Sequence, residues 1–126
     1  MKGYIQGNWH DDNGEFLPVW VSERARRFGI PGTGCTVVVN EIKKAEGPVK
    51  ERPMHVHPHE QIMLIVRGNG ELVLDGERYP MKAGGYFVIP ANVPHRFDAS
   101  QTEEDVLNID IFYPTRNEYV VRNENK

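Results

Sequence analysis

The stretch His55-Val56-His57-Pro58-His59-Glu60-Gln61 decides the fold and the expected chemistry of this chain. It runs into the apolar segment Ile62-Met63-Leu64-Ile65-Val66, which has the length and composition of a buried β-strand. Side chains two residues apart on an extended strand point to the same face, so His55 and His57 project together, and Gln61 shares their parity. Two imidazoles and an amide oxygen that converge form most of a divalent metal site.

A fourth ligand must come from elsewhere in the chain, and His95, after the proline-bounded loop 90–94, is the candidate. Glu60 has the opposite parity and is expected to face away from the site. His59 has the right parity, and it stays open as an alternative to Gln61 because the preceding proline can bend the chain. Imidazole with amide oxygen suits one divalent ion of nickel, zinc, iron, manganese or cobalt. The sequence therefore predicts a metal site at His55, His57, Gln61 and His95.

The composition of the chain excludes several classes of function. A length of 126 residues predicts a single domain (1–126) with room for a core. A net charge of −3 offers no basic excess for nucleic acid or an anionic membrane. No apolar run approaches the roughly 20 residues of a spanning helix, and the first residues lack the apolar core of a secretory signal. The single cysteine, Cys35, cannot form an intramolecular disulfide, so a cytoplasmic setting is expected.

Turn signals divide the rest of the chain into short strands. Asp75-Gly76 is a strong signal for a two-residue hairpin. Only residues 22–28 have helical character, their three arginines are expected to be a solvated surface, and residues 29–34 are expected to form a loop. The predicted strands cover residues 3–9, 16–21, 35–43, 55–57, 61–66, 71–74, 77–81, 86–89, 95–97 and 106–112. Many short strands punctuated by glycine and proline predict an all-β barrel or sandwich.

Three stretches resemble the two signature motifs of the cupin superfamily: His55-x-His57-x3-Gln61-x6-Gly68, Gly76-x3-Pro80-x3-Gly84 and Pro90-x3-Pro94-His95. The resemblance covers about residues 34–112. It implies a single-domain antiparallel jelly-roll β-barrel, with N-terminal strands and a C-terminal tail outside it. It also implies a metal held inside by the four residues already named.

The chain departs from the cupin pattern at two positions. Gln61 stands where cupins usually have glutamate, and Gly85 stands where an acidic residue is common. A ligand set of three imidazoles and one amide is neutral and leaves the full positive charge on the metal. This favours a Lewis acid over a redox centre.

A narrower resemblance lies downstream, where Asp110-Ile111-Phe112-Tyr113-Pro114-x-Arg116 is similar to the cupins of pectin and alginate breakdown. Those proteins convert cyclic 4,5-unsaturated uronates into linear keto acids. The resemblance implies that Asp110 moves protons, Arg116 binds the sugar carboxylate and Phe112 forms a pocket wall. Along residues 107–112 the alternation puts Asn108, Asp110 and Phe112 on one face. That pattern alone fits a pocket lining and an ordinary solvated strand equally well.

Two other functions stay open. One is a cupin dioxygenase that uses a redox metal and O₂, and the other is a non-enzymatic cupin that binds a sugar or another small ligand. In each case the expected partner is a small molecule, for the proposed enzyme a sugar acid. Exposed apolar residues near the start of the chain, Tyr4, Ile5 and Trp9, suggest a homodimer formed by sheet packing or strand exchange.

Overall fold

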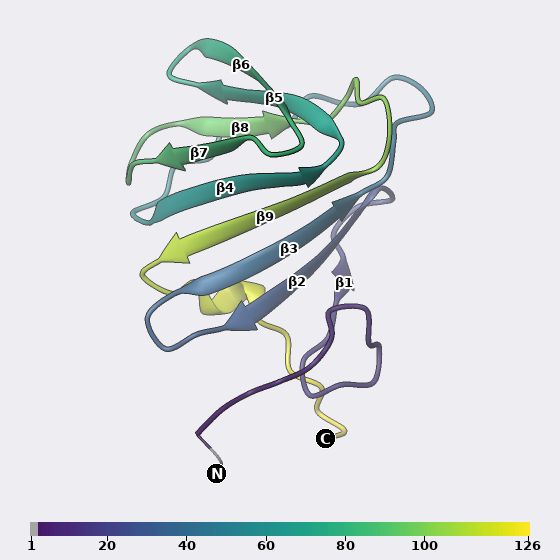
Figure 1. Cartoon of the computed structure of the whole chain (residues 1–126), viewed down its shortest axis with the longest axis vertical. Helices are drawn as coiled ribbons and strands as arrows, with labels where there is room; N and C mark the ends of the chain where they lie inside the picture. The colour runs from purple at the N-terminus through teal and green to yellow at the C-terminus, as the bar shows by residue number, and fades with distance from the viewer. Residues whose placement is uncertain (1–2) are drawn as a thin grey trace.

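Nine antiparallel strands in two sheets make up most of the regular structure of residues 3–126, the part of the chain that the computed structural model describes (Figure 1). The larger sheet has the order β1-β2-β3-β9-β4-β7 and the smaller one the order β6-β5-β8. The predicted all-β jelly-roll class is confirmed. The strands are β1 Val19–Trp20, β2 Ala25–Pro31, β3 Thr36–Ile42, β4 Glu60–Arg67, β5 Asn69–Leu74, β6 Glu77–Lys82, β7 Tyr86–Ile89, β8 His95–Asp98 and β9 Val106–Tyr113.

Alternation along β4 connects the core with the cavity that lies beside it. Gln61, Met63 and Ile65 are buried on one face, while the residues between them are partly or fully exposed. Met63 and Ile65 join a compact apolar cluster, and Gln61 at the start of the strand lines a cavity. The other buried members of the cluster are Leu72, Met81 and Ile89. One face of β4 therefore supplies both core packing and a polar ligand.

The Asp75-Gly76 hairpin forms as predicted between β5 and β6. Both residues have positive φ, 49° and 81°, as a type I′ turn requires. Leu74 pairs with Glu77 directly across the turn, so the turn fixes the register of the two strands.

Several predicted elements at the N-terminal end were wrong. Residues 25–28 are not helical but open β2, and the expected loop 29–34 begins only at Gly32, because β2 continues to Pro31. All seven residues of β2 pair with β3, and this pairing overrides the weak local helical signal. Residues 3–9 form no strand, and of the expected strand 16–21 only β1 and an isolated bridge at Phe16 are extended. His55 makes an isolated bridge with His95, and residues 56 and 57 are not strand.

After β9 the chain folds back over the mouth of the barrel. A short 3₁₀ helix, η1 (Asn117–Tyr119), packs against β2 and β3 (Figure 1). A side chain at Gly29 would overlap the backbone carbonyl of Tyr119, so glycine is required for this close approach. The C-terminal tail, expected outside the barrel core, thus contributes to its open end. No helix among residues 3–126 has the length and apolar character needed to cross a membrane.

Candidate metal centre

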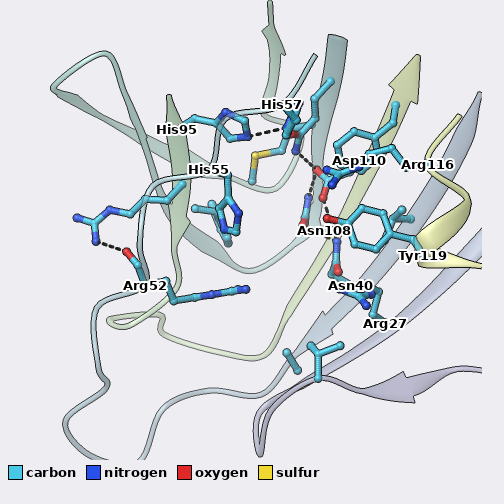
Figure 2. Close-up of a pocket in the computed structure, with 18 of the residues that line it drawn as sticks. Arg27, Asn40, Arg52, His55, His57, His95, Asn108, Asp110, Arg116 and Tyr119 are labelled. Carbon is cyan, nitrogen blue, oxygen red and sulfur yellow. Dashed lines mark hydrogen bonds between the residues drawn. The ribbon is translucent and has the colours of Figure 1, made fainter. Parts of the chain in front are cut away.

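A cavity of about 120 Å³ lies between the two sheets at the open end of the barrel (Figure 2). Its lining residues come from β2, β3, β4, β5, β8, β9, residue 21, the 52–57 segment and the tail after β9. All seven residues that the sequence predicted for the site are among them: His55, His57, Gln61, His95, Asp110, Phe112 and Arg116.

Three of the four expected metal ligands converge at the top of this cavity. The Nε2 atom of His57 lies 3.2 Å from the Nε2 atom of His95 and 3.1 Å from Oε1 of Gln61. All three residues are buried. Gln61 is held by the start of β4 and His95 by the start of β8, while His57 lies in the connection that leads into β4.

Backbone carbonyls fix which ring nitrogens face one another. Nδ1 of His57 lies 3.0 Å from the carbonyl oxygen of His59, and Nδ1 of His95 lies 2.9 Å from that of Val93. A carbonyl can only accept, so each Nδ1 carries the proton and each neutral ring presents an Nε2 lone pair. Two imidazole lone pairs and an amide oxygen therefore point at one another with no proton between them. Such a cluster of acceptors is stabilised by a cation.

The spacing of these acceptors fits a transition-metal ion. Ligand bonds of about 2.0–2.2 Å at tetrahedral or octahedral angles put neighbouring ligand atoms roughly 3.0–3.5 Å apart, as they are here. His55 lies farther off, with its ring centre 6.2 Å from that of His95, and it is more exposed. Within residues 3–126 no three His, Cys, Asp or Glu side chains form a metal-ligand group. The convergent set is instead two imidazoles and an amide, and His55 faces the same cavity (Figure 2).

Burial favours the neutral forms of His55 and His57. Burial lowers the pKa of His57 below its ordinary value of 6.5, and the neighbouring His95 lowers it further. Burial also lowers the pKa of His55, with Arg52 as the next cause. Neutral imidazole is the form that binds a metal, so the cavity favours the ligating state at neutral pH.

Asp110 is joined to the metal cluster through the amide of Gln61. Oδ1 of Asp110 accepts hydrogen bonds from Nε2 of Gln61 at 2.9 Å and Nδ2 of Asn108 at 3.2 Å, and Oδ2 accepts one from Nδ2 of Asn40 at 3.0 Å. Burial raises the pKa of this carboxyl group, and the three amide donors oppose the rise. The hydrogen bond from Nε2 orients the Gln61 side chain so that Oε1 faces the histidines. The odd–even pattern of β9 thus produces a pocket lining and not a solvated strand.

Arg116 and Phe112 form the wall opposite the histidines. The Arg116 guanidinium carbon lies 5.0 Å from the centre of the Phe112 ring, and its backbone N–H donates to Oγ1 of Thr36 at 2.8 Å. The charge has one weak partner, Glu118, at 3.3 Å on the exposed side. His59, the alternative ligand, does not line the cavity; its ring lies edge-on to Phe112 with 6.4 Å between centres.

The sequence predictions did not include several polar residues of the cavity, among them Arg27, Asn40 and Tyr119. Arg27 was assigned to a solvated surface, but it faces inward from β2, directly across from Asn40 of β3. The expected strand 35–43 could have identified Asn40 as an isolated polar residue in a β-branched run. Tyr119 follows the last predicted strand and had no signal of its own.

Comparison with known proteins places this geometry in a family. Residues 46–112 match the sequence model described as Cupin domain. The structure is similar to that of KdgF from Halomonas sp., with a TM-score of 0.68 and 27% identity over 84% of this chain and 93% of that one. An RmlC-like cupin from Shewanella frigidimarina has the same TM-score at 21% identity, over 83% of this chain and 89% of the other.

A curated relative is similar over a shorter stretch. Quercetin 2,3-dioxygenase from Bacillus subtilis is 51% identical over 47 residues, which are 36% of this chain but only 14% of the dioxygenase. The chain therefore spans only a small part of that relative.

Proposed function

This chain belongs to the cupin family, and on that premise we propose that it is a metal-dependent enzyme that converts a cyclic 4,5-unsaturated uronate to its linear keto form. One observation carries the proposal. A convergent set of neutral metal ligands is hydrogen-bonded, through Gln61, to a buried carboxyl group in the same cavity as an arginine. The resemblance to the uronate-linearising cupins and the similarity to KdgF support it.

The residues present fit one divalent transition metal held by His57, His95 and Gln61, with His55 as the fourth ligand. A metal bound there supplies a Lewis acid that stabilises negative charge on a substrate oxygen. Because the Gln61 amide is neutral, it does not reduce the positive charge that a bound metal presents to that oxygen. The identity of the ion is set by affinity and supply, because imidazole and amide oxygen suit several metals.

The reaction needs proton transfer but no change of oxidation state. The C1 hydroxyl loses a proton as the bond from C1 to the ring oxygen breaks, which leaves an aldehyde at C1 and an enol at C5. The enol then gains a proton at C4 and loses the proton of its C5 hydroxyl, which leaves a ketone at C5. Asp110 lines the cavity and is the carboxyl group placed to move these protons, a role expected to contribute about 10²–10⁴ in rate.

Arg116 and Phe112 position the sugar. The Arg116 guanidinium offers two parallel N–H donors to the uronate carboxylate. Its stacking on the Phe112 ring holds the fork in place. Phe112 is itself buried and forms an apolar wall that keeps water from the enol.

The direct test follows the absorbance of the conjugated C4=C5 bond in unsaturated galacturonate or mannuronate, compared with spontaneous ring opening. Metal-loaded protein should accelerate its loss. Asp110→Asn should retain its metal, since the new amide oxygen can still accept from Gln61, while turnover falls by at least about 10²-fold. Metal-loaded wild-type protein that equals the blank would reject the uronate reaction. Normal turnover in Asp110→Asn would reject the acid–base role.

A dioxygenase is the second candidate, because 47 residues of this chain are 51% identical to a stretch of a quercetin 2,3-dioxygenase. The neutral Gln61 ligand favours Lewis-acid chemistry over this alternative. An oxygen electrode separates the two functions: uronate linearisation consumes no O₂. Substrate-dependent O₂ uptake by the iron- or nickel-loaded protein would favour the dioxygenase.

A further inference from the structure

Arg27 is a cation without a counter-ion on the cavity wall. It is half-buried on β2, and no carboxylate of residues 3–126 forms an ion pair with it. Its Nε atom is buried with no hydrogen-bond partner in that part of the chain. Burying an unpaired charge costs free energy, and a bound anion at Arg27 would offset that cost.

The tail after β9 holds Arg27 and Arg116 apart. The guanidinium carbon of Arg27 lies 4.4 Å from the centre of the Tyr119 ring, and that of Arg116 lies 4.5 Å from it. Figure 2 shows the Tyr119 ring between the two arginines. Because an aromatic ring separates the two forks, a single carboxylate cannot accept from both.

The charges that line the cavity are unbalanced. Arg27, Arg52, Arg96 and Arg116 face one carboxylate, Asp110, whose oxygens already accept from three amides. Arg96 is paired with Glu51 and Arg116 with Glu118, whereas no carboxylate of residues 3–126 forms an ion pair with Arg27 or Arg52. Burial lowers the pKa of Arg27, and the charges of Arg52 and Arg116 lower it further, while Tyr119 and Glu118 act in the opposite direction. One uronate carboxylate would neutralise only part of this excess.

We propose that Arg27 forms a second anion subsite, and that the ligand of this cavity is a small sugar acid with two acidic groups. One group binds Arg116 and the other binds Arg27 on the far side of Tyr119. The inference rests on the proposed function for the Arg116 contact, and it narrows the substrate to an acidic sugar with a second anionic substituent. Arg27 lies on β2, outside the matched cupin segment 46–112.

Binding of two unreactive six-carbon acids tests the subsite. Galactarate has two carboxylates and galacturonate has one, and isothermal titration of the metal-loaded protein measures both. Galactarate should bind about 10- to 100-fold more tightly, the worth of one charge-assisted contact. Arg27→Gln should lower the affinity for galactarate to that for galacturonate and leave the affinity for galacturonate unchanged. Arg27→Lys should restore part of the affinity for galactarate. The matched control is Arg26→Gln, because Arg26 pairs with Asp12 and does not line the cavity.

Three results would overturn the inference: equal affinity of the wild type for the two acids, binding of neither, or unchanged galactarate affinity in Arg27→Gln. A thermal melt of each variant shows that a loss of affinity is not a loss of fold. The binding assay contains no turnover step. If uronate linearisation is absent but galactarate binding depends on Arg27, the proposed reaction fails and the subsite stands. If turnover is present and Arg27 has no effect, the subsite alone fails.

Discussion

Gln61 is the residue at which this chain departs most clearly from other cupins, and its neighbour gives a physical reason. Its Nε2 atom donates to Asp110 at 2.9 Å while its Oε1 atom faces the histidines. A glutamate has no N–H to donate, so at this position it would bring two carboxylates into contact. Like charges at this distance force one of them to hold a proton. A glutamine at this position can therefore offer its oxygen to a metal ion and donate a hydrogen bond to the Asp110 carboxylate.

The Gln61→Glu variant should accordingly still bind a metal, but its metal-free form should be less stable than metal-free wild type. We expect the free energy of unfolding after chelation to fall by about 1–3 kcal/mol, since a buried hydrogen bond is replaced by a carboxylate pair. Turnover should fall as well, because the added negative charge weakens the Lewis acid. Elemental analysis and thermal melts with and without chelator measure both effects. Gln101→Glu, on an exposed loop, is the matched control. A metal-free Gln61→Glu protein as stable as wild type would contradict the role assigned to the Asp110 contact.

The lowered histidine pKa values predict how the metal-free protein responds to acid. Both His55 and His57 have a pKa below 6.5 in the folded protein. At pH values between the folded pKa and 6.5, the unfolded chain therefore binds more protons than the folded one. The free energy of unfolding should therefore decrease as pH falls below about 6.5. The buried Asp110 carboxyl acts in the opposite direction, between its ordinary pKa and its raised folded pKa, because there the folded chain binds more protons than the unfolded one.

Thermal melts of chelator-treated protein at pH 7.5 and 5.5 would measure this effect. His57→Gln should show a smaller loss than wild type. His10→Gln changes a histidine with an exposed side chain outside the cavity and should behave as wild type does. Equal pH dependence in wild type and His57→Gln would contradict the prediction.

At the scale of the elements, local signals predicted the strands whose patterns were strong. The β-branched run of β3, the alternation of β4 and β9 and the Asp75-Gly76 turn all formed near the expected residues. The element with a misleading local signal was β2, because Ala25, Arg26 and Arg27 at its start belong to the segment 22–28 that was predicted to be helical. β2 is a strand because it pairs with β3, and this pairing cannot be read from the residues of β2 alone.

The contact between Gly29 of β2 and η1 gives a prediction about the pocket wall. Gly29→Ala would place a methyl group against the Tyr119 carbonyl and push η1 away from the sheet. We expect a loss of about 1–3 kcal/mol in stability and a higher KM for an acidic sugar, since Tyr119 stacks with both Arg27 and Arg116. Thermal melts and KM measurements check the two effects. Gly34→Ala, where a side chain meets open space, should change neither. An unchanged KM in a folded Gly29→Ala protein would show that η1 does not shape the site.

Across the whole molecule, the sequence predicted seven residues of the cavity, the four proposed metal ligands among them, but not the other polar residues that line it. The ligands fall within short motifs, so spacing and parity were enough to group His55, His57 and Gln61 and to point to His95. Arg27 and Tyr119 are separated by most of the chain and meet only when β2 and the tail after β9 pack together. The contact between Arg27 and Tyr119 depends on tertiary packing, which no periodic pattern in the sequence indicates.

The outer face of the larger sheet bears on the assembly of the whole protein, which we propose to be a homodimer. Strand β7 is an edge of that sheet, and its Tyr86 and Val88 side chains are 71% and 50% exposed. They lie directly across from Leu64 and Ile62 of β4, so the four side chains form a continuous apolar strip next to an unpaired strand edge. Such a strip is more typical of an interface than of a solvated face. The N-terminal residues Tyr4 and Ile5, the surface first suggested by the sequence, are also exposed but belong to no sheet.

Burial of the β7 strip in a dimer predicts that one charge in its centre separates the protomers. Val88→Asp should convert the protein at micromolar concentration from a species of twice 14.4 kDa to one of 14.4 kDa, because the dimer would have to bury an unpaired carboxylate. Sedimentation velocity measures both species. Val49→Asp is the matched control, since Val49 is a 36% exposed valine in the 45–53 loop, away from the strip. If wild-type protein sediments only at 14.4 kDa, the chain does not dimerise; if Val88→Asp remains a dimer, the interface lies on another surface.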